Sequence, residues 1–526
     1  MKDETIFYTP FGGSREIGMN MYAYGFKKNN KIKYIIVDAG VAFPKFQSEP
    51  GVDLIFANPS LVLKNIDDLE AIFITHAHED HLGAIGFVSS KLKCKIYCRS
   101  FTASIVKDKL ERVKIDQSRV VIVKEWPYEI KLKFATISFF PAIHSVPEAS
   151  FLIIKTGIGN ILHTGDFKLD KTPVLENPLD VKLLIQALEG PPALCVADST
   201  NALNSDVGKS EKTIIEPIEK LMKDCKGRVV FTTFASNLAR LKSIAKAGEK
   251  VGRSVVVLGR AMNNMLEKAF DNEILLDFPS RVDAKRAYQI PPENLLIIAT
   301  GSQGEPRAVS SQLSKGKYMS LELQKGDTFV FSSKTIPGNE VAVNRVINNL
   351  TEKGIKVRYE EDRTFHVSGH TNVPDLKGFY KSLKPKLVIP MHGEPRHIYA
   401  HSELLNTQQI RNIIVKNGEI VEIDKDLHVK TKNIAEAERL FVDGTVIASS
   451  DNIAFSERRK IASEGILLVL LNITKKNKKI CIEFDSIGLP RFDDYASELK
   501  NRAEVFLNNA GQTNNKIELQ ITEKIE

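Results

Sequence analysis

The stretch "ITHAHEDHLGA", residues 74–84, constrains the fold more than any other part of the chain. Three histidines and two acids lie within His76 to His81, directly after the apolar run "LEAIFIT". That run predicts a buried strand, at whose end His76 and His78 point the same way because side chains alternate with period two. Glu79 and Asp80 then suit the N-terminal end of a helix, from whose first turn Asp80 and His81 would project. A solvated charge cluster would not need three imidazoles beside a buried strand, so the pattern predicts a metal site.

Two metal ions about 3.5–4 Å apart form a hydrolytic site, and six consecutive residues cannot supply ligands for both. Further candidates follow other apolar runs, where a loop can aim them into a shared cleft. These are His144, Asp166 and His392, and Asp166 can bridge both ions. Imidazole and carboxylate together suit Zn²⁺ and related divalent cations. The predicted metal ligands are therefore His76, His78, Asp80, His81, His144, Asp166 and His392.

The pattern of elements changes along the chain. Short strand-like runs dominate the first two hundred residues or so, and after about residue 208 helices and strands alternate as in a parallel-sheet domain. After about residue 365 the first pattern returns, as in "KPKLVIPMHGEPRH", residues 384–397. Since 526 residues exceed the size of one hydrophobic core, two or three domains are expected.

Composition and the length of the apolar runs argue against a disulfide-rich protein and against a membrane-spanning one. A formal net charge of +8 is compatible with a polyanionic partner, although a basic groove matters more than the total. The five cysteines are mostly scattered and indicate no disulfide framework. The N-terminus lacks a basic-then-apolar signal, and no run approaches the ~18 apolar residues that span a bilayer. A soluble, cytoplasmic protein without a membrane partner is expected.

Several motifs carry a family resemblance. "THAHEDH" resembles the metallo-β-lactamase signature, "VADST" with Asp198 resembles motif A of the β-CASP subgroup, "FHVSGH" with His370 its motif B, and "PMHGEPRH" with His392 its motif C. Strings such as "GGSREIGMNM", "TTFASN" and "ATGSQGEP" resemble the bacterial ribonuclease J family. The resemblance covers roughly residues 8 to 447, with the motifs in the family's order.

The resemblance implies an α/β fold: a metallo-β-lactamase αββα sandwich with an inserted β-CASP α/β domain and a small C-terminal α+β domain. The expected boundaries place the first part of the sandwich at 1–207 and the β-CASP domain at 208–363. The return segment of the sandwich follows at 364–447, a linker at 448–463 and the short C-terminal domain at 464–526.

Residue roles are also implied by the resemblance. His76, His78, His144 and Asp166 would bind one metal, and Asp80, His81, Asp166 and His392 the other. Asp38 would orient a histidine ligand. His370 would be the general acid, with Asp198 orienting it and keeping it protonated. Two Zn²⁺ are implied, with Mn²⁺ or Mg²⁺ as alternatives in activity.

Two segments are implied to bind RNA. One is "HVSGH", with His366, Val367, Ser368, Gly369 and His370; the other is Ala235, Ser236 and Asn237 of "FASN". For "FASN" alone, a strand-to-helix turn capped by Ser236 is an equal alternative. Gly51, Asp53 and Asp443 match positions at which some family members hold a structural Ca²⁺, an ion that prefers oxygen ligands.

The implied function is a metal-dependent ribonuclease with 5′→3′ exonuclease and endonuclease activity in rRNA processing and mRNA decay. It would act on single-stranded RNA, prefer a 5′-monophosphate, and leave 5′-phosphate and 3′-OH ends. A homodimer or homotetramer and other RNA-decay proteins are implied partners, although the C-terminal tail departs from the family pattern. The alternatives are a DNA-processing β-CASP nuclease, a small-molecule metallo-hydrolase and a non-catalytic RNA-binding scaffold.

Overall fold

The computed structural model describes residues 4–44, 49–59, 62, 64–359, 364–433, 437–474 and 479–510. The chain divides into two compact units. The large unit comprises Met1–Ala42 and Ile55–Arg439, and the small unit comprises Phe43–Leu54 and Leu440–Glu526. All the predicted metal ligands belong to the large unit.

The large unit contains an eight-stranded mixed sheet in the order β23-β22-β1-β2-β3-β6-β7-β8. Its N-terminal strands pair as antiparallel neighbours, and β6 to β8 add in parallel. The strands are β1 (Thr5–Gly12), β2 (Met21–Lys28), β3 (Lys31–Val37), β6 (Leu69–Phe73), β7 (Lys95–Cys98), β8 (Val120–Ile122), β22 (Glu419–Asp424) and β23 (Val429–Asn433). Strand β22 pairs with β1, so residues from distant parts of the sequence are neighbours in this sheet.

A six-stranded sheet follows the order β21-β13-β12-β11-β10-β9. Its strands are β9 (Glu129–Lys131), β10 (Thr136–Pro141), β11 (Ser150–Thr156), β12 (Gly159–His163), β13 (Leu194–Asp198) and β21 (Val388–Met391). Strand β21 pairs in parallel with β13 and sets Asp198 opposite Met391. This register brings Asp198 next to His392, although they are far apart in sequence.

The two sheets pack face to face around one apolar core. Inward-facing side chains such as Tyr8 and Tyr24 from the first sheet meet Ile137 and Leu152 from the second. The other face of the six-stranded sheet is covered by α5 (Val181–Ala187), α11 (Val373–Leu383) and α12 (Pro395–Thr407). Helix α4 (Ser100–Arg112) packs on β7 and β8 of the first sheet. The expected αββα sandwich is confirmed.

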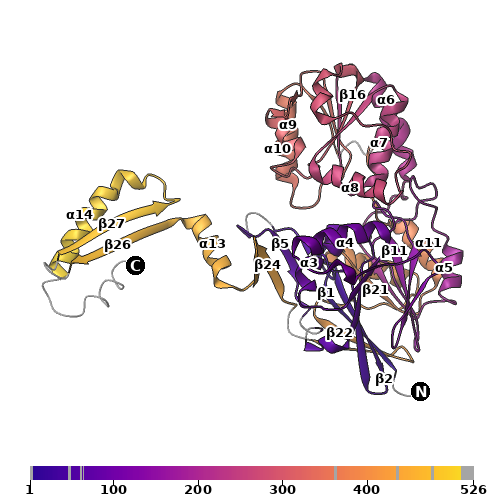
Figure 1. The fold of residues 1–526 in the computed structure, drawn as a ribbon. Helices are drawn as coiled ribbons and strands as arrows, with labels where there is room; N and C mark the ends of the chain where they lie inside the picture. The colour runs from indigo at the N-terminus through magenta and orange to yellow at the C-terminus, as the bar shows by residue number, and fades with distance from the viewer. Residues whose placement is uncertain are drawn as a thin grey trace. The chain divides into compact units, whose positions relative to one another are not determined.

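Between β13 and β21 the chain forms a separate five-stranded parallel sheet in the order β15-β16-β14-β19-β20. Its strands are β14 (Val229–Thr232), β15 (Ser254–Leu258), β16 (Leu295–Ala299), β19 (Thr328–Phe331) and β20 (Lys356–Arg358). Apolar side chains of α9 (Val309–Lys315) and α10 (Glu340–Glu352) join its core. Helix α7 (Leu238–Lys250) packs on β15 and β16 and beside α6 (Ile215–Asp224), as Figure 1 shows. The expected inserted α/β domain is confirmed, whereas its limits at 208 and 363 stay predictions; residue 363 lies outside the described residues.

The small unit contains the hairpin of β24 (Arg439–Asp443) and β25 (Val446–Ser449), which is followed by helix α13 (Ile453–Glu464). Strand β26 (Ile466–Thr474) then pairs with β27 (Lys479–Ile487), and helix α14 (Phe492–Ala510) follows. Residues 453–464, most of the expected linker, form helix α13 (Ile453–Glu464), whose N-cap Asn452 accepts a hydrogen bond from the Ala454 amide. The expected α+β character of the C-terminal segment holds, while residues 511–526 of it lie outside the described residues. In the described parts of both units, no helix combines the length and apolar content needed to cross a bilayer.

Candidate metal centre

The histidine cluster lies where the sequence pattern places it, at the end of β6. The strand ends at Phe73, two residues earlier than expected, and a loop then carries His76 and His78. Helix α2 (Glu79–Leu82) starts directly after His78, so Asp80 and His81 project from its first turn. His76 and His81 are fully buried.

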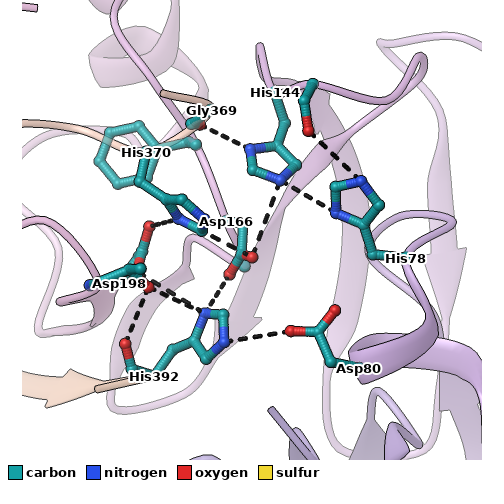
Figure 2. Close-up of polar contacts among 12 residues, drawn as sticks. His78, Asp80, His144, Asp166, Asp198, Gly369, His370 and His392 are labelled. Carbon is teal, nitrogen blue, oxygen red and sulfur yellow. Dashed lines mark hydrogen bonds and ion pairs between the residues drawn. The ribbon is translucent and has the colours of Figure 1, made fainter. Parts of the chain in front are cut away.

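The structure brings all seven predicted ligands into two adjoining groups that share Asp166. The potential ligand atoms of His76, His78, His144 and Asp166 lie within 4.8 Å of one another. The same holds for Asp80, His81, Asp166 and His392. Figure 2 shows Asp166 between His144 on one side and His392 on the other. His144 follows β10, and Asp166 follows β12.

The first group is already in the protonation state that binds a cation. Burial lowers the pKa of His78 to about 4 and holds the pKa of His76 and His144 well below the usual histidine value. All three imidazoles are therefore neutral near pH 7, and a neutral imidazole nitrogen can bind a metal ion.

The second group is dominated by carboxylate charge. Burial lowers the pKa of His392, but Asp166 and Asp80 outweigh burial and raise it to about 10. Nδ1 of His392 lies 2.7 Å from Asp166 Oδ1. Its Nε2 is buried and lies 3.2 Å from Asp80 Oδ2. Two carboxylates that converge on a buried imidazole fit a divalent cation, whose binding would release the histidine proton.

Asp38 orients His81, a member of the second group. It is fully buried, and its backbone has the left-handed φ of 61° that few non-glycine residues adopt. Its Oδ1 accepts a hydrogen bond from the Thr75 amide at 2.8 Å, and His81 Nδ1 donates to its Oδ2 at 2.8 Å. The carboxylate therefore fixes which nitrogen of His81 faces the other ligands.

His370 and Asp198 form a pair at the rim of the metal groups. Nδ1 of His370 donates to Asp198 Oδ2 at 2.8 Å. Burial lowers the pKa of His370, but the Asp198 carboxylate outweighs it and the net pKa is raised. Potential ligand atoms of both residues also lie within 4.8 Å of those of Asp166 and His392. An imidazole whose protonated form is favoured is thus held beside the potential cation ligands (Figure 2).

Two positioning residues were not predicted from the sequence. The amide and hydroxyl of Thr200 donate to Asp198 Oδ1 at 2.8 and 2.7 Å. Asn201 Nδ2 donates to Ser368 Oγ at 2.8 Å and to the His370 carbonyl at 3.2 Å. Both residues directly follow "VADS", so their closeness to Asp198 in the sequence was the available signal.

The structure brings only some residues of the two predicted RNA-binding segments together. Asn237, Ser368 and Gly369 line one pocket together with His144 and Lys168. Ala235 and Ser236 are not among the residues that line it. The N-cap of α7 is Asn237, which accepts a hydrogen bond from the Arg240 amide, so the alternative cap at Ser236 is wrong.

The predicted calcium residues lie together in the small unit. The Gly444 amide donates to Asp53 Oδ2 at 2.8 Å. Arg458 donates to Asp443 Oδ2 at 2.5 Å and to the Gly51 carbonyl at 3.4 Å. A guanidinium group therefore already supplies positive charge to two of the three residues, which fits a calcium ion poorly.

Three family models match the chain. Residues 33–186 match the beta-lactamase superfamily domain, and residues 226–350 match the beta-CASP domain of ribonuclease J. Residues 354–415 match the Zn-dependent metallo-hydrolase RNA specificity domain. The matches follow the order of the first sandwich part, the inserted domain and the return segment.

Relatives are similar over almost the whole chain. The chain is 34% identical to ribonuclease J of Sinorhizobium meliloti, covering 95% of this chain and 89% of the relative. It is 33% identical to ribonuclease J 1 of Streptococcus pyogenes, covering 90% and 84%. A crystal structure of a protein of unknown function from Enterococcus faecalis V583 shares the fold, with a TM-score of 0.55, 16% identity, and coverage of 80% of this chain and all of that one.

Proposed function

Because the chain belongs to the ribonuclease J family and is a ribonuclease of the metallo-β-lactamase superfamily, we propose that it degrades RNA by 5′→3′ exonuclease and endonuclease cleavage. Hydrolysis would leave 5′-phosphate and 3′-OH ends. The observation that carries the proposal is the His370–Asp198 pair beside two groups of cation ligands that share Asp166.

We propose two Zn²⁺ as the bound ions, with Mn²⁺ or Mg²⁺ as alternatives in activity. His76, His78, His144 and Asp166 would hold one ion, and Asp80, His81, Asp166 and His392 the other. When bound, such ions lower the pKa of water and offset the charge of a phosphodiester. Asp166 would tie the two sites together, and Asp38 would keep His81 in the binding tautomer.

The protein's own acid is His370. Attack by a hydroxide ion on phosphorus forms one P–O bond and breaks the bond to the 3′-oxygen, which leaves as an alkoxide unless it is protonated. Asp198 stabilises the charged form of His370 and raises its pKa, which favours the protonated acid. His370 would donate its proton to the leaving 3′-oxygen, and Thr200 and Asn201 would hold Asp198 and the His370 loop in position.

The substrate in this proposal is single-stranded RNA with a 5′-monophosphate. The pocket lined by Asn237, Ser368 and Gly369 beside His144 supports this choice, since amide and hydroxyl groups suit phosphate oxygens. His366 and Val367 would contribute to the same loop. The resemblance extends the proposal to rRNA processing and mRNA decay.

Location and assembly complete the proposal. Five free thiols support a cytoplasmic site of action, where thiols stay reduced. Exposed apolar side chains on the β26–β27 hairpin, among them Leu470 at 63% and Ile487 at 59% exposure, support assembly into a homodimer or homotetramer. Other RNA-decay proteins are further proposed partners.

The test uses matched 5′-labelled RNAs that carry either a monophosphate or a triphosphate. Mononucleotide release from the monophosphorylated RNA alone would support exonuclease action with 5′-end recognition, and internal fragments from both would support endonuclease action. Preferential cleavage of a DNA of the same sequence would favour the DNA-processing alternative. Hydrolysis of a thioester without RNA cleavage would favour the small-molecule alternative.

A further inference from the structure

Arg240, on the first turn of α7, is an arginine with no exposed surface. Its guanidinium forms a bidentate ion pair with Glu211, which lies on the 3-10 helix η3 (Glu211–Ile214). The Nε–Oε1 distance is 2.6 Å and the Nη2–Oε2 distance is 3.0 Å. Nη1 donates to the carbonyl and hydroxyl of Ser332 at 2.7 and 2.9 Å. Burying a charge is costly unless it is paired and hydrogen-bonded, and here both conditions are met.

The same guanidinium reaches the loop that leads to His370. Nη2 donates to the Val367 carbonyl at 3.2 Å, and Nη1 lies 3.4 Å from the Phe365 carbonyl and 3.3 Å from His366 Nδ1. Ser332 Oγ also donates to the Phe365 carbonyl at 2.6 Å. The start of the loop is therefore held by the β-CASP domain.

The far end of this loop is held by the lactamase domain. Gly369 O accepts from His144 Nδ1 at 2.6 Å, and His370 pairs with Asp198. Glu211 is itself tied to the lactamase domain, because its amide donates to Asp170 Oδ2 at 3.0 Å, four residues beyond the shared ligand Asp166. The Arg240–Glu211 pair thus links the segment after Asp166 to the loop that carries His370.

We propose that Arg240, paired with Glu211, is a positioning residue that sets the 365–370 loop, so that His370 and Ser368 face the ligand groups. The proposal rests on the general-acid role proposed above for His370. A shift of about 1 Å at a reacting group can cost on the order of a hundredfold in rate, which makes a rigid, five-donor side chain a suitable anchor.

The neutral state of His366 is consistent with this arrangement. Burial, together with the charges of Arg240, Lys334 and Lys168, lowers the pKa of His366 to about 3, and a hydrogen bond with the Ser332 backbone opposes this shift. His366 is therefore neutral near pH 7, and Arg240 is the cation that contacts this part of the loop. A charged imidazole would repel the guanidinium that holds the loop in place.

Arg253 offers a matched control within the same domain. It is also buried, at 5% exposure, and it also donates to backbone carbonyls, including those of Gly227 and Leu295. It contacts neither the loop nor a ligand residue. Replacing either arginine by methionine removes a buried guanidinium and keeps an apolar stem of similar length.

The experiment compares Arg240→Met, Arg240→Lys and Arg253→Met in the full-length, metal-loaded protein. The measurements are kcat and KM on an internally labelled RNA, bound metal by mass spectrometry, and Tm. We expect Arg240→Met to lose about a hundredfold in kcat with unchanged metal content, and Arg240→Lys to recover part of the loss. Arg253→Met is expected to retain kcat within about threefold, whatever its Tm. Equal losses of kcat in the two methionine variants, or wild-type kcat in Arg240→Met, would overturn the proposal.

A milder variant covers the case in which Arg240→Met does not fold. Ser332→Ala removes one hydroxyl that contacts both Arg240 and the Phe365 carbonyl, and it leaves the Arg240–Glu211 pair intact. A several-fold fall in kcat at unchanged metal content is expected, and unchanged kcat would count against the proposal. Failure of the general-acid role is distinguishable, because His370→Ala would then cleave at the wild-type rate whatever Arg240 does.

Discussion

His370 Nδ1 lies 2.8 Å from Asp198 Oδ2, although 172 positions separate the two residues in the sequence. The inserted domain lies between them in the chain, and the β13–β21 register sets Asp198 opposite Met391, next to His392. The pair places the His370 imidazole beside Asp166, which both groups of potential ligands share. Under the proposed mechanism, a chain that had only the histidine cluster would lack the general acid.

Replacing Asp198 by asparagine should shift the pH dependence of cleavage. The wild-type pKa of His370 is raised by Asp198, so the acid stays protonated above pH 6.5 and kcat falls only as pH rises through the raised value. In Asp198→Asn the alkaline fall should move to lower pH, because the charge that stabilises the imidazolium is gone. Profiles of kcat against pH check this, and an unmoved alkaline limb would contradict it.

His370→Ala should lower kcat by about 10²–10⁴-fold, the range for loss of a general acid, while RNA binding persists. The exposed His428 provides a control, and His428→Ala should leave kcat unchanged. Single-turnover cleavage and filter binding measure the two quantities. Cleavage by His370→Ala at the wild-type rate would remove the general-acid assignment.

Asp80→Ala should lose one of the two metal ions together with cleavage. Asp80 Oδ2 lies 3.2 Å from His392 Nε2 and 3.6 Å from His81 Nε2, and its removal takes one of the four donors from the second group. Metal content per chain, measured after dialysis, should fall from about two to about one. The exposed Asp271 serves as control; full metal content in Asp80→Ala would contradict the ligand assignment.

His401 should make the fold sensitive to acid. It lies between the Ser199 hydroxyl and the Tyr380 hydroxyl, each at 2.8 Å, and burial lowers its pKa to about 4. Its folded pKa is below the unfolded value of about 6.5, so the unfolded chain binds the proton more readily between these values. The stability is present above pH 6.5 and is lost as pH falls toward 4.

Between pH 7.5 and pH 5 the loss from His401 alone should be about 2 kcal/mol of unfolding free energy. Denaturant unfolding of the wild type and of His401→Gln at both pH values measures it, since glutamine can still hydrogen-bond to both hydroxyls. The variant should lose less stability on acidification. Equal losses in the two proteins would show that His401 does not titrate on unfolding.

Calcium should not raise the Tm of the wild type, because Arg458 already pairs with Asp443 and contacts the Gly51 carbonyl. A ligand stabilises a fold only if it binds the folded state more tightly than the unfolded one. Thermal melts with calcium or with a chelator provide the measurement. A calcium-dependent rise in Tm would instead show that the ion displaces Arg458 and that the three predicted residues bind it.

Local patterns in the sequence were enough to predict several features. The spacing of His76, His78, Asp80 and His81 depends on one strand end and one helix turn, whose periodicities act over a few residues. The change to a βα alternation likewise predicted the inserted parallel sheet. The local pattern did not decide between neighbouring polar residues: the cap of α7 is Asn237 rather than Ser236.

By itself, the sequence determined which residue types are available and at which strand ends they lie. Only the tertiary structure decided which of them meet: His370 with Asp198, His81 with Asp38, and Arg240 with the loop before His370. The physical reason is that these contacts depend on the register between distant strands and on the packing of two domains. From the sequence alone, an arginine in a helix is expected at the surface. The fold instead buries Arg240 beside Glu211, and Ser332 and the loop carbonyls are its other partners.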